Sequence, residues 1–263
     1  MLNVHPPMPR SDSPLARALA PLVGSLWTLF ALWTVIVAAV WTTGYGDAQL
    51  GEQVKNADLR AALSWMLHAL DAVWITLAAV NVYLALARAE GLAVARSWAA
   101  LVLGVAFVIA GASALWHWPL GAVHYPRNFG VKLGPVPLAV PLLWLASVVG
   151  AREFALRLLP RASHARIAGA TAFLSALTDA NLEPLAWKWR AWWLWYPTDF
   201  AAPSWPPPQN SATWLLAGFA LAWTMRPPSV VPRMARRPFE PIAALALVNA
   251  VCLLTHAVHF LRR

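Results

Sequence analysis

The sequence of 263 residues has few charged residues. Asp, Glu, Lys and Arg together make up 12% of the chain, whereas 60% of the residues are hydrophobic. A soluble domain usually carries about 25% charged residues, so this shortage argues against a soluble globular protein. Several apolar windows approach the roughly 20 residues that are needed to cross a bilayer. The sequence therefore predicts an integral membrane protein that has the lipid bilayer as a partner.

Cysteine is nearly absent. Cys252 is the single cysteine, which excludes an internal disulfide and a cluster of thiolate ligands. The sequence also has no HExxH pattern, no c-type haem signature and no aspartate-rich pair suited to a Mg²⁺-bound diphosphate. His256 and His259 lie three residues apart and keep a metal or haem site open as an alternative. We nevertheless expect no metal and no cofactor.

The net charge of +9 raises the question of nucleic acid, but the Lys and Arg residues lie in short connections between apolar runs. In that position they act as topology signals, so we expect no nucleic acid as a partner. The amino-terminal tail and the connections after the second, fourth and sixth runs hold twelve of them, and the opposite side holds eight. This bias predicts insertion in the inner (cell) membrane with a cytoplasmic amino terminus.

Breaks rich in Gly and Pro separate seven apolar runs. Their approximate bounds are 20–41, 61–87, 93–116, 135–158, 166–185, 210–226 and 241–261. Residues 1–19 are rich in proline and are predicted to be a disordered tail, while 20–263 are predicted to form a single transmembrane domain. The first run has no clear cleavage site, so we interpret it as a retained helix. The expected fold is an all-α, polytopic integral membrane bundle of about seven helices.

This topology places polar residues from several runs on one side, the outer half if the amino terminus is cytoplasmic. Asp179 and Glu183 are four residues apart at the end of the fifth run, so they share a helix face. Acids inside a bilayer are costly and usually face the bundle interior, where they serve a function. A second interpretation places both acids at the interface, solvated and paired with Lys188 or Arg190.

Another acid lies deeper, in the second run. Asp71 follows His68 by three residues, so the two side chains share a helix face. Buried ionisable groups normally find partners, so one interpretation is a His–Asp pair that satisfies itself and ties two helices together. The other interpretation is a functional acid.

Tryptophans follow the acids of the fifth run at once, at positions 187, 189, 192, 193 and 195. Trp is enriched at membrane interfaces, so an interfacial belt is one interpretation. An indole face also stabilises a cation, by up to about 2 kcal/mol where water is excluded. A carboxylic acid beside indoles is suited to protonating an alkene and sheltering the carbocation that results. Composition alone does not select that chemistry.

Residues 117–144 read HWPLGAVHYPRNFGVKLGPVPLAVPLLW. This segment, with the stretches after it, resembles the membrane carotenoid-biosynthesis family that includes the carotenoid 1,2-hydratases and bisanhydrobacterioruberin hydratase. The family has a GFPFGxYxY-like stretch, a VPLxxPLAW-like stretch, two acids four residues apart before Pro, and a PLxNxxGW-like stretch. The matching residues are Pro119, Gly121, Tyr125, Val136, Pro137, Leu138, Pro141, Leu142, Trp144, Asp179, Glu183, Pro184, Pro207, Asn210 and Trp214.

The sequence departs from this family pattern at two places. The family has a Glu inside the third run, a few residues before the first stretch, where this sequence reads VIAGASALW and has no acid. Val123 replaces the first tyrosine of the GFPFGxYxY-like stretch. If the missing Glu is catalytic, the chain is a diverged or inactive member of the family, unless Asp71 or His117 takes its place.

The resemblance implies an enzyme that needs no cofactor. An acid protonates the terminal C1=C2 double bond of a ψ-end-group carotenoid such as lycopene or γ-carotene, and water adds to the tertiary cation to give a tertiary alcohol. Asp179 is the expected proton donor, with Glu183 or Asp71 as its charge partner or as the base that prepares the water. The expected substrate-binding residues are Trp144 and Trp187 beside the cation, Tyr125 and Asn210 at the water, and His117 and His68.

The implied partner is a hydrophobic carotenoid substrate, and a complex with other carotenoid enzymes stays open. Two other functions stay open. A carotenoid end-group cyclase or isomerase would use the same protonation but let an internal alkene capture the cation. A non-enzymatic lipid or proton-coupled membrane transporter or assembly protein would use Asp71 and Asp179 as relay groups. The inverted repeats that many transporters carry are not visible in the sequence.

Overall fold

The computed structural model describes residues 14–45, 47–126, 129–196, 206–226 and 238–262, and the structural statements below concern these residues. Most of the predicted amino-terminal tail, residues 1–13, lies outside the described part. The first helix begins at Pro14, inside the segment that was expected to be tail.

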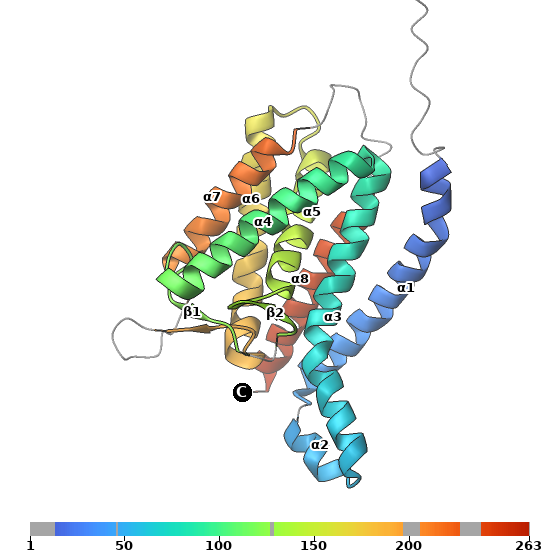
Figure 1. Ribbon diagram of the computed structural model, residues 1–263, viewed down its shortest axis with the longest axis vertical. Coiled ribbons are helices and arrows are strands. Elements are labelled where there is room, and N and C mark those ends of the chain that lie inside the picture. Colours follow the sequence, from blue (N-terminus) through green and yellow to red (C-terminus); the bar gives the residue numbers. More distant parts are fainter. Residues whose placement is uncertain (1–13, 46, 127–128, 197–205, 227–237, 263) are drawn as a thin grey trace, which may run out of the picture.

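The fold is an all-α bundle, as predicted (Figure 1). Two pairs of short strands and one π-helix, η2 (Pro184–Trp189), occupy the connections. Strand β1 (Val123–His124) pairs antiparallel with β4 (Leu194–Trp195), and β2 (Lys132–Leu133) pairs antiparallel with β3 (Val136–Pro137). The helices are α1 (Pro14–Thr43), α2 (Asp47–Gln53), α3 (Ala57–Glu90), α4 (Leu92–Trp116), α5 (Ala139–Leu158), α6 (His164–Glu183), α7 (Pro208–Thr224) and α8 (Glu240–Leu261).

Within the described residues, five helices are long and apolar enough to cross a membrane: α1 from Ala20, α3, α4, α5 and α8. They make the chain a membrane protein. The other two expected spans correspond to α6, which carries polar residues at its carboxyl end, and α7, which has 17 residues. The count of seven spans and the orientation in the membrane therefore stay predictions.

Local sequence signals explain where helices begin and end. Asn56 caps α3 by accepting the Leu59 N–H at 2.9 Å, so this helix begins four residues before the expected span. Gly91, at φ 90°, ends α3 in a conformation that favours glycine. Helix α6 ends at Glu183, because Pro184 begins η2 there. The short helix α2, in the connection between α1 and α3, was not predicted.

Helix α5 lies at the centre of the bundle, and most of its side chains from Ala139 to Leu156 are buried. Glycines allow two pairs of helices to pack closely, α5 with α8 and α7 with α6. A Cβ at Gly150 would lie 2.8 Å from the Pro241 carbonyl oxygen of α8, and a Cβ at Gly218 of α7 would lie 3.2 Å from Ala172 Cα of α6. Helices α5 and α8, and helices α6 and α7, are thus closely packed at these glycines.

One end of the bundle gathers the carboxyl end of α6, the amino end of α7 and the β1–β4 pair, in the lower part of the view (Figure 1). The strand register places Val123 opposite Trp195. The connection that leads into β1 also packs closely on the start of α7, since a Cβ at Gly121 would lie 2.8 Å from Pro207 Cγ. Gly121 adopts φ 114°, which favours glycine. These contacts fix the loops over the end of α6.

Candidate active site

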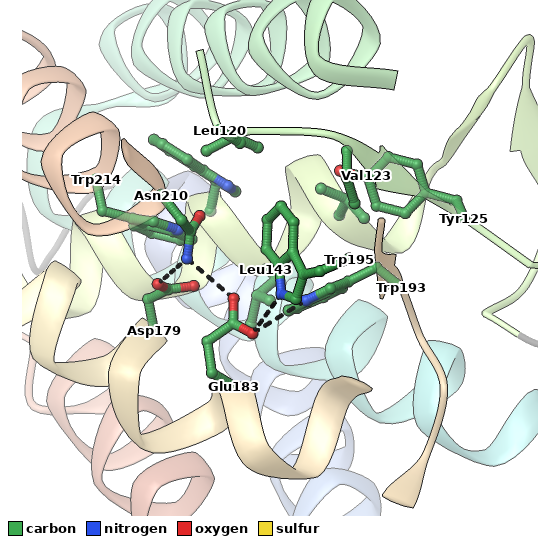
Figure 2. Close-up of a pocket in the computed structure, with 12 residues that line it drawn as sticks. Leu120, Val123, Tyr125, Leu143, Asp179, Glu183, Trp193, Trp195, Asn210 and Trp214 are labelled. Atoms are coloured by element: carbon green, nitrogen blue, oxygen red, sulfur yellow. Dashed lines mark hydrogen bonds between the residues drawn. The ribbon is translucent and has the colours of Figure 1, made fainter. Parts of the chain in front are cut away.

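A small pocket of about 20 Å³, which is room for about one water molecule, lies at this end of the bundle. Its walls come from α5, α6, α7 and the β1–β4 pair, and most of its lining is apolar or aromatic. Figure 2 shows the polar side chains gathered on one side of it. The lining residues are Leu120, Val123, Tyr125, Val140, Leu143, Trp144, Asp179, Glu183, Trp193, Trp195, Asn210 and Trp214.

Asp179 and Glu183 form the acidic side of the pocket. They lie one turn apart near the carboxyl end of α6, as their spacing predicts, and both are buried, at 4% and 2% exposure. Both carboxyls point toward Asn210 of α7 (Figure 2). The interior placement agrees with the expectation for acids in a membrane bundle.

The Asn210 amide joins the two acids. Its Nδ2 donates to Asp179 Oδ2 at 2.7 Å and to Glu183 Oε1 at 2.9 Å. The amide nitrogen has two hydrogens, so each acid receives one. The amide oxygen points away from the acids (Figure 2). Asn210 therefore holds the two carboxyls in a fixed relation.

Two indoles hold the other oxygen of Glu183. Trp195 Nε1 donates to Oε2 at 3.1 Å and Trp193 Nε1 donates to the same oxygen at 3.3 Å. Successive side chains of an extended segment point to opposite sides, so residues two apart point to the same side. The extended backbone around β4 thus directs both indoles at Glu183 (Figure 2).

The remaining walls are aromatic and aliphatic. Trp144 of α5 and Trp214 of α7 stack with ring centroids 3.8 Å apart and an interplanar angle of 18°. Leu120, Val123 and Leu143 complete the apolar lining around them. Apart from the two acids and Asn210, the pocket lining is therefore of the kind that contacts a hydrocarbon.

None of the described lining residues is Lys, Arg or His. Within the described part of the chain, neither Asp179 nor Glu183 forms a salt bridge, and Arg190 pairs with Asp71 instead. Pairing of the two acids with Lys188 or Arg190, the second interpretation of the sequence, is therefore not what the structure shows. The pocket holds two carboxyls and no compensating cation among these residues.

Tyr125 lies in the connection between α4 and α5 and is buried at 3% exposure. Burial raises the pKa of its phenol, and the nearby charges of Glu183 and Asp179 raise it further. The phenol therefore stays protonated at physiological pH and can donate a hydrogen bond to a polar group in the pocket.

The structure brings five of the nine predicted site residues together: Tyr125, Trp144, Asp179, Glu183 and Asn210. The four others do not line the pocket, and two of these are exposed at helix surfaces. His117 follows α4 with φ 60°. His68 Nδ1 donates to the Ser64 carbonyl oxygen at 2.7 Å.

The two remaining residues lie elsewhere. Trp187 is half-buried in η2, with the Lys188 ammonium 4.9 Å from its ring centroid. Asp71 is buried in α3 but accepts N–H groups from Trp41, Arg190 and Trp192. Neither Asp71 nor His117, the two residues considered as replacements for the acid that the third run lacks, lines the pocket.

Besides four aliphatic lining residues, three aromatic residues of the pocket were not predicted as site residues: Trp193, Trp195 and Trp214. The Trp-x-Trp spacing of the first two is the signal that could have found them, because it places both side chains on one side of an extended segment. Trp214 already appeared among the residues that match the family pattern. In the described residues, no group of three or more His, Cys, Asp and Glu side chains is arranged to hold a metal ion.

Comparison with known proteins gives one finding. A family model described as carotenoid biosynthesis protein matches residues 70–261, which include every residue that lines the pocket. No curated protein and no solved structure matches the chain.

Proposed function

The chain belongs to the carotenoid biosynthesis protein family, and from this premise we propose that it adds water to the terminal C1=C2 double bond of a ψ-end-group carotenoid. The family assigns the chain a role in carotenoid biosynthesis. One observation carries the finer proposal: a buried Asp–Glu pair without a cation closes an apolar, tryptophan-lined pocket.

The acid pair is suited to holding a proton. Two uncompensated negative charges at this depth would be costly, and a buried charge that lacks a partner usually neutralises. One proton on the pair removes most of that cost. The resulting carboxylic acid is the proton donor that a simple alkene requires.

The hydrogen bonds distinguish the two acids. Glu183 accepts three N–H groups, from Asn210, Trp193 and Trp195. Hydrogen bonds to a carboxylate favour its charged form. Asp179 accepts two, from the Asn210 amide at Oδ2 and from the Trp214 side chain. We therefore assign the negative charge to Glu183 and the proton to Asp179.

The reaction then balances without a cofactor. The Asp179 proton and the alkene electron pair form a new C–H bond at C2, which leaves a tertiary cation at C1. A water oxygen bonds to C1, and the surplus proton of that water passes to the Glu183 carboxylate. Return of this proton to Asp179 restores the starting state. The net change is the addition of one water to the double bond.

Aromatic side chains in the walls of the pocket are suited to stabilising the cation. Indole faces stabilise a cation by up to about 2 kcal/mol when water is excluded, and Trp144 and Trp214 supply aromatic surface beside Asp179. The Glu183 carboxylate adds an opposite charge. The Asn210 oxygen, which points away from both acids (Figure 2), and the protonated Tyr125 phenol are the candidates to orient the water.

The proposed reaction does not need an acid in the third run, where this sequence lacks the Glu of the family pattern. Helix α4 places none of its described side chains in the lining, and both carboxyls come from α6. The proposed mechanism uses these two acids and requires no third.

Pigment analysis tests the proposal. The chain is expressed in a bacterium that accumulates lycopene or γ-carotene, and extracted pigments are separated by chromatography and identified by mass spectrometry. We expect a new pigment heavier by one water. Asp179→Asn should lower its formation by about 10²–10⁴-fold, the usual contribution of a general acid, with normal membrane expression.

The matched control is Asp58→Asn, which makes the same chemical change at an exposed acid in the first turn of α3. This variant should retain full activity. A product of unchanged mass would assign the chain to cyclisation or isomerisation instead. Failure to convert either carotenoid, with the wild-type protein confirmed in the membrane, would contradict the proposal.

A further inference from the structure

Asp71 is a buried acid that the proposed reaction does not use. Its exposure is 2%, and it lies in α3 outside the pocket. Three N–H groups from two different segments converge on it. Trp41 of α1 donates to Oδ1 at 3.0 Å, and Arg190 Nε and Trp192 Nε1 donate to Oδ2 at 2.8 and 2.7 Å.

Two of these donors belong to the segment that carries the pocket indoles. Arg190 and Trp192 bind Asp71, and Trp193, the next residue, binds Glu183. Trp195 then binds Glu183 as well. Side chains of the segment 190–195 are thus hydrogen-bonded to Asp71 of α3 and to Glu183 of α6.

The packing around Trp192 makes this connection stiff. Its ring stacks on Phe129, with centroids 4.4 Å apart and planes at 9°, and it also contacts Trp41 and Trp193. Its backbone N–H donates to the Ala186 carbonyl oxygen at 2.6 Å. Trp192 and Trp193 are both buried and their rings are in edge contact, with centroids 5.9 Å apart, so the position of one ring constrains the other.

The backbone of the same segment needs such support. Ala191 adopts φ 48°, in the left-handed region that residues with a side chain rarely occupy. Strained positions persist where the surroundings determine them. The residues on both sides of Ala191, Arg190 and Trp192, donate to Asp71. Farther along the chain, β4 pairs with β1, and the Tyr196 N–H donates to the Ala122 carbonyl oxygen at 2.9 Å.

We propose that Asp71 is a positioning residue, which holds Arg190 and Trp192 so that Trp193 and Trp195 stay hydrogen-bonded to Glu183. The role rests on the proposed function, because Glu183 is the group that takes the proton from water. Asp71 itself touches neither substrate nor reacting atoms in this account.

Two variants test this role. Asp71→Asn replaces a carboxylate oxygen, which accepts, with an amide NH₂ group, which donates. At least one N–H group of Trp41, Arg190 or Trp192 then loses its acceptor. Trp192→Phe keeps an aromatic ring but removes the indole N–H that Asp71 accepts, and it serves if Asp71→Asn does not fold. The matched control is Asp58→Asn, the same acid-to-amide change at an exposed acid of the same helix.

The first readout does not depend on activity. The chain is labelled with 5-fluorotryptophan and purified in detergent, and the fluorine-19 NMR signals of the two pocket indoles are assigned by their loss in Trp193→Phe and Trp195→Phe. Asp71→Asn and Trp192→Phe should shift or broaden both signals. Asp58→Asn should leave both signals in place. Unchanged signals in both test variants would overturn the proposal, whatever reaction the chain catalyses.

The second readout is a double-mutant cycle on product formation. Loss of one hydrogen bond to a charged group corresponds to about tenfold or more in rate, so Asp71→Asn and Trp193→Phe should each lower turnover by that amount with little change in KM. Because both act through Glu183, the double variant should be little slower than either single variant. Fully multiplicative losses would show that Asp71 acts independently, which overturns the proposal.

An inactive wild-type chain would contradict the proposed function, whereas the NMR signals test the link from Asp71 to the indoles separately. Both results together therefore show which of the two proposals fails. Asp71→Glu is the conservative rescue: it keeps the charge and the acceptor atoms, so it should recover more turnover than Asp71→Asn.

Discussion

Asn210→Ala is the sharpest perturbation of the acid pair, because one side chain binds both carboxyls. The substitution removes the donor that lies 2.7 Å from Asp179 Oδ2 and 2.9 Å from Glu183 Oε1. It leaves both acids in place. Any loss of activity then measures how strongly their arrangement matters.

The magnitude follows from the bond to the charged acid. A hydrogen bond to a charged group contributes about 1.5–3 kcal/mol. At 1.36 kcal/mol for each factor of ten, its loss corresponds to about 10- to 150-fold in turnover. The second bond, to the neutral Asp179 acid, adds a smaller amount. Asn210→Asp should lose at least as much, because it adds a third acid and removes the donor.

The assay follows conversion of lycopene by isolated membranes, with product normalised to the amount of chain. Asn81→Ala is the control: Asn81 is a fully buried amide on α3, and its Nδ2 donates to the Leu77 carbonyl oxygen at 2.9 Å. It should lower thermal stability but leave turnover within about twofold. Full turnover in Asn210→Ala, or an equal loss in Asn81→Ala, would refute the reasoning.

Three further predictions concern the packing of the bundle and of the loop beside the pocket. Gly121→Ala should lower both activity and thermal stability, because the new Cβ would lie 2.8 Å from Pro207 Cγ and because residue 121 has a φ of 114°, which favours glycine. Product formation measures the activity, and unfolding in detergent measures the stability. Gly150→Ala should lower the unfolding temperature by separating α5 from α8, and an unchanged temperature would contradict the close packing at the Pro241 carbonyl. Arg152→Met should destabilise the chain by about 3–5 kcal/mol, because it removes the buried guanidinium that pairs with Glu153 at 2.9 Å. Glu153→Gln in the same chain should recover part of the loss, as measured by unfolding in detergent.

The membrane bundle was predictable from the sequence because long apolar runs and their breakers are local signals. The bounds of α4 and α8 lie within one residue of the expected spans at 93–116 and 241–261. The predicted starts of α1 and α3 were late, because amphipathic or polar first turns do not register as apolar runs. Helix α2 was missed for the same reason: DAQLGEQ has little hydrophobic character.

The acid pair was also predictable, because a spacing of four residues on a helix places Asp179 and Glu183 on one face. Asn210 and Trp144 entered through the family pattern and do line the pocket. The partners of Asp71 were not predictable. Its indole donors lie 30 and 121 residues away, and no periodicity connects such distant segments.

The tryptophan stretch shows where local interpretation ends. Interfacial enrichment explains the composition of residues 187–195 but not the turn that divides their roles. η2 is a π-helix, and Ala191 adopts a positive φ after it. Trp192 then faces Asp71, while Trp193 and Trp195 face Glu183. A backbone conformation that the residue types disfavour decides this division, and the sequence carries no signal for it.

The most direct test of the central claim is the origin of the oxygen in the product. Membranes that contain the chain are incubated with lycopene in water enriched in oxygen-18, and the product is analysed by mass spectrometry. Hydration by the acid pair predicts a tertiary alcohol that carries the isotope at the enrichment of the solvent, formed by the wild type and not by Asp179→Asn. A product without the isotope, whether an isomer of lycopene or an alcohol with oxygen from another source, would contradict the account.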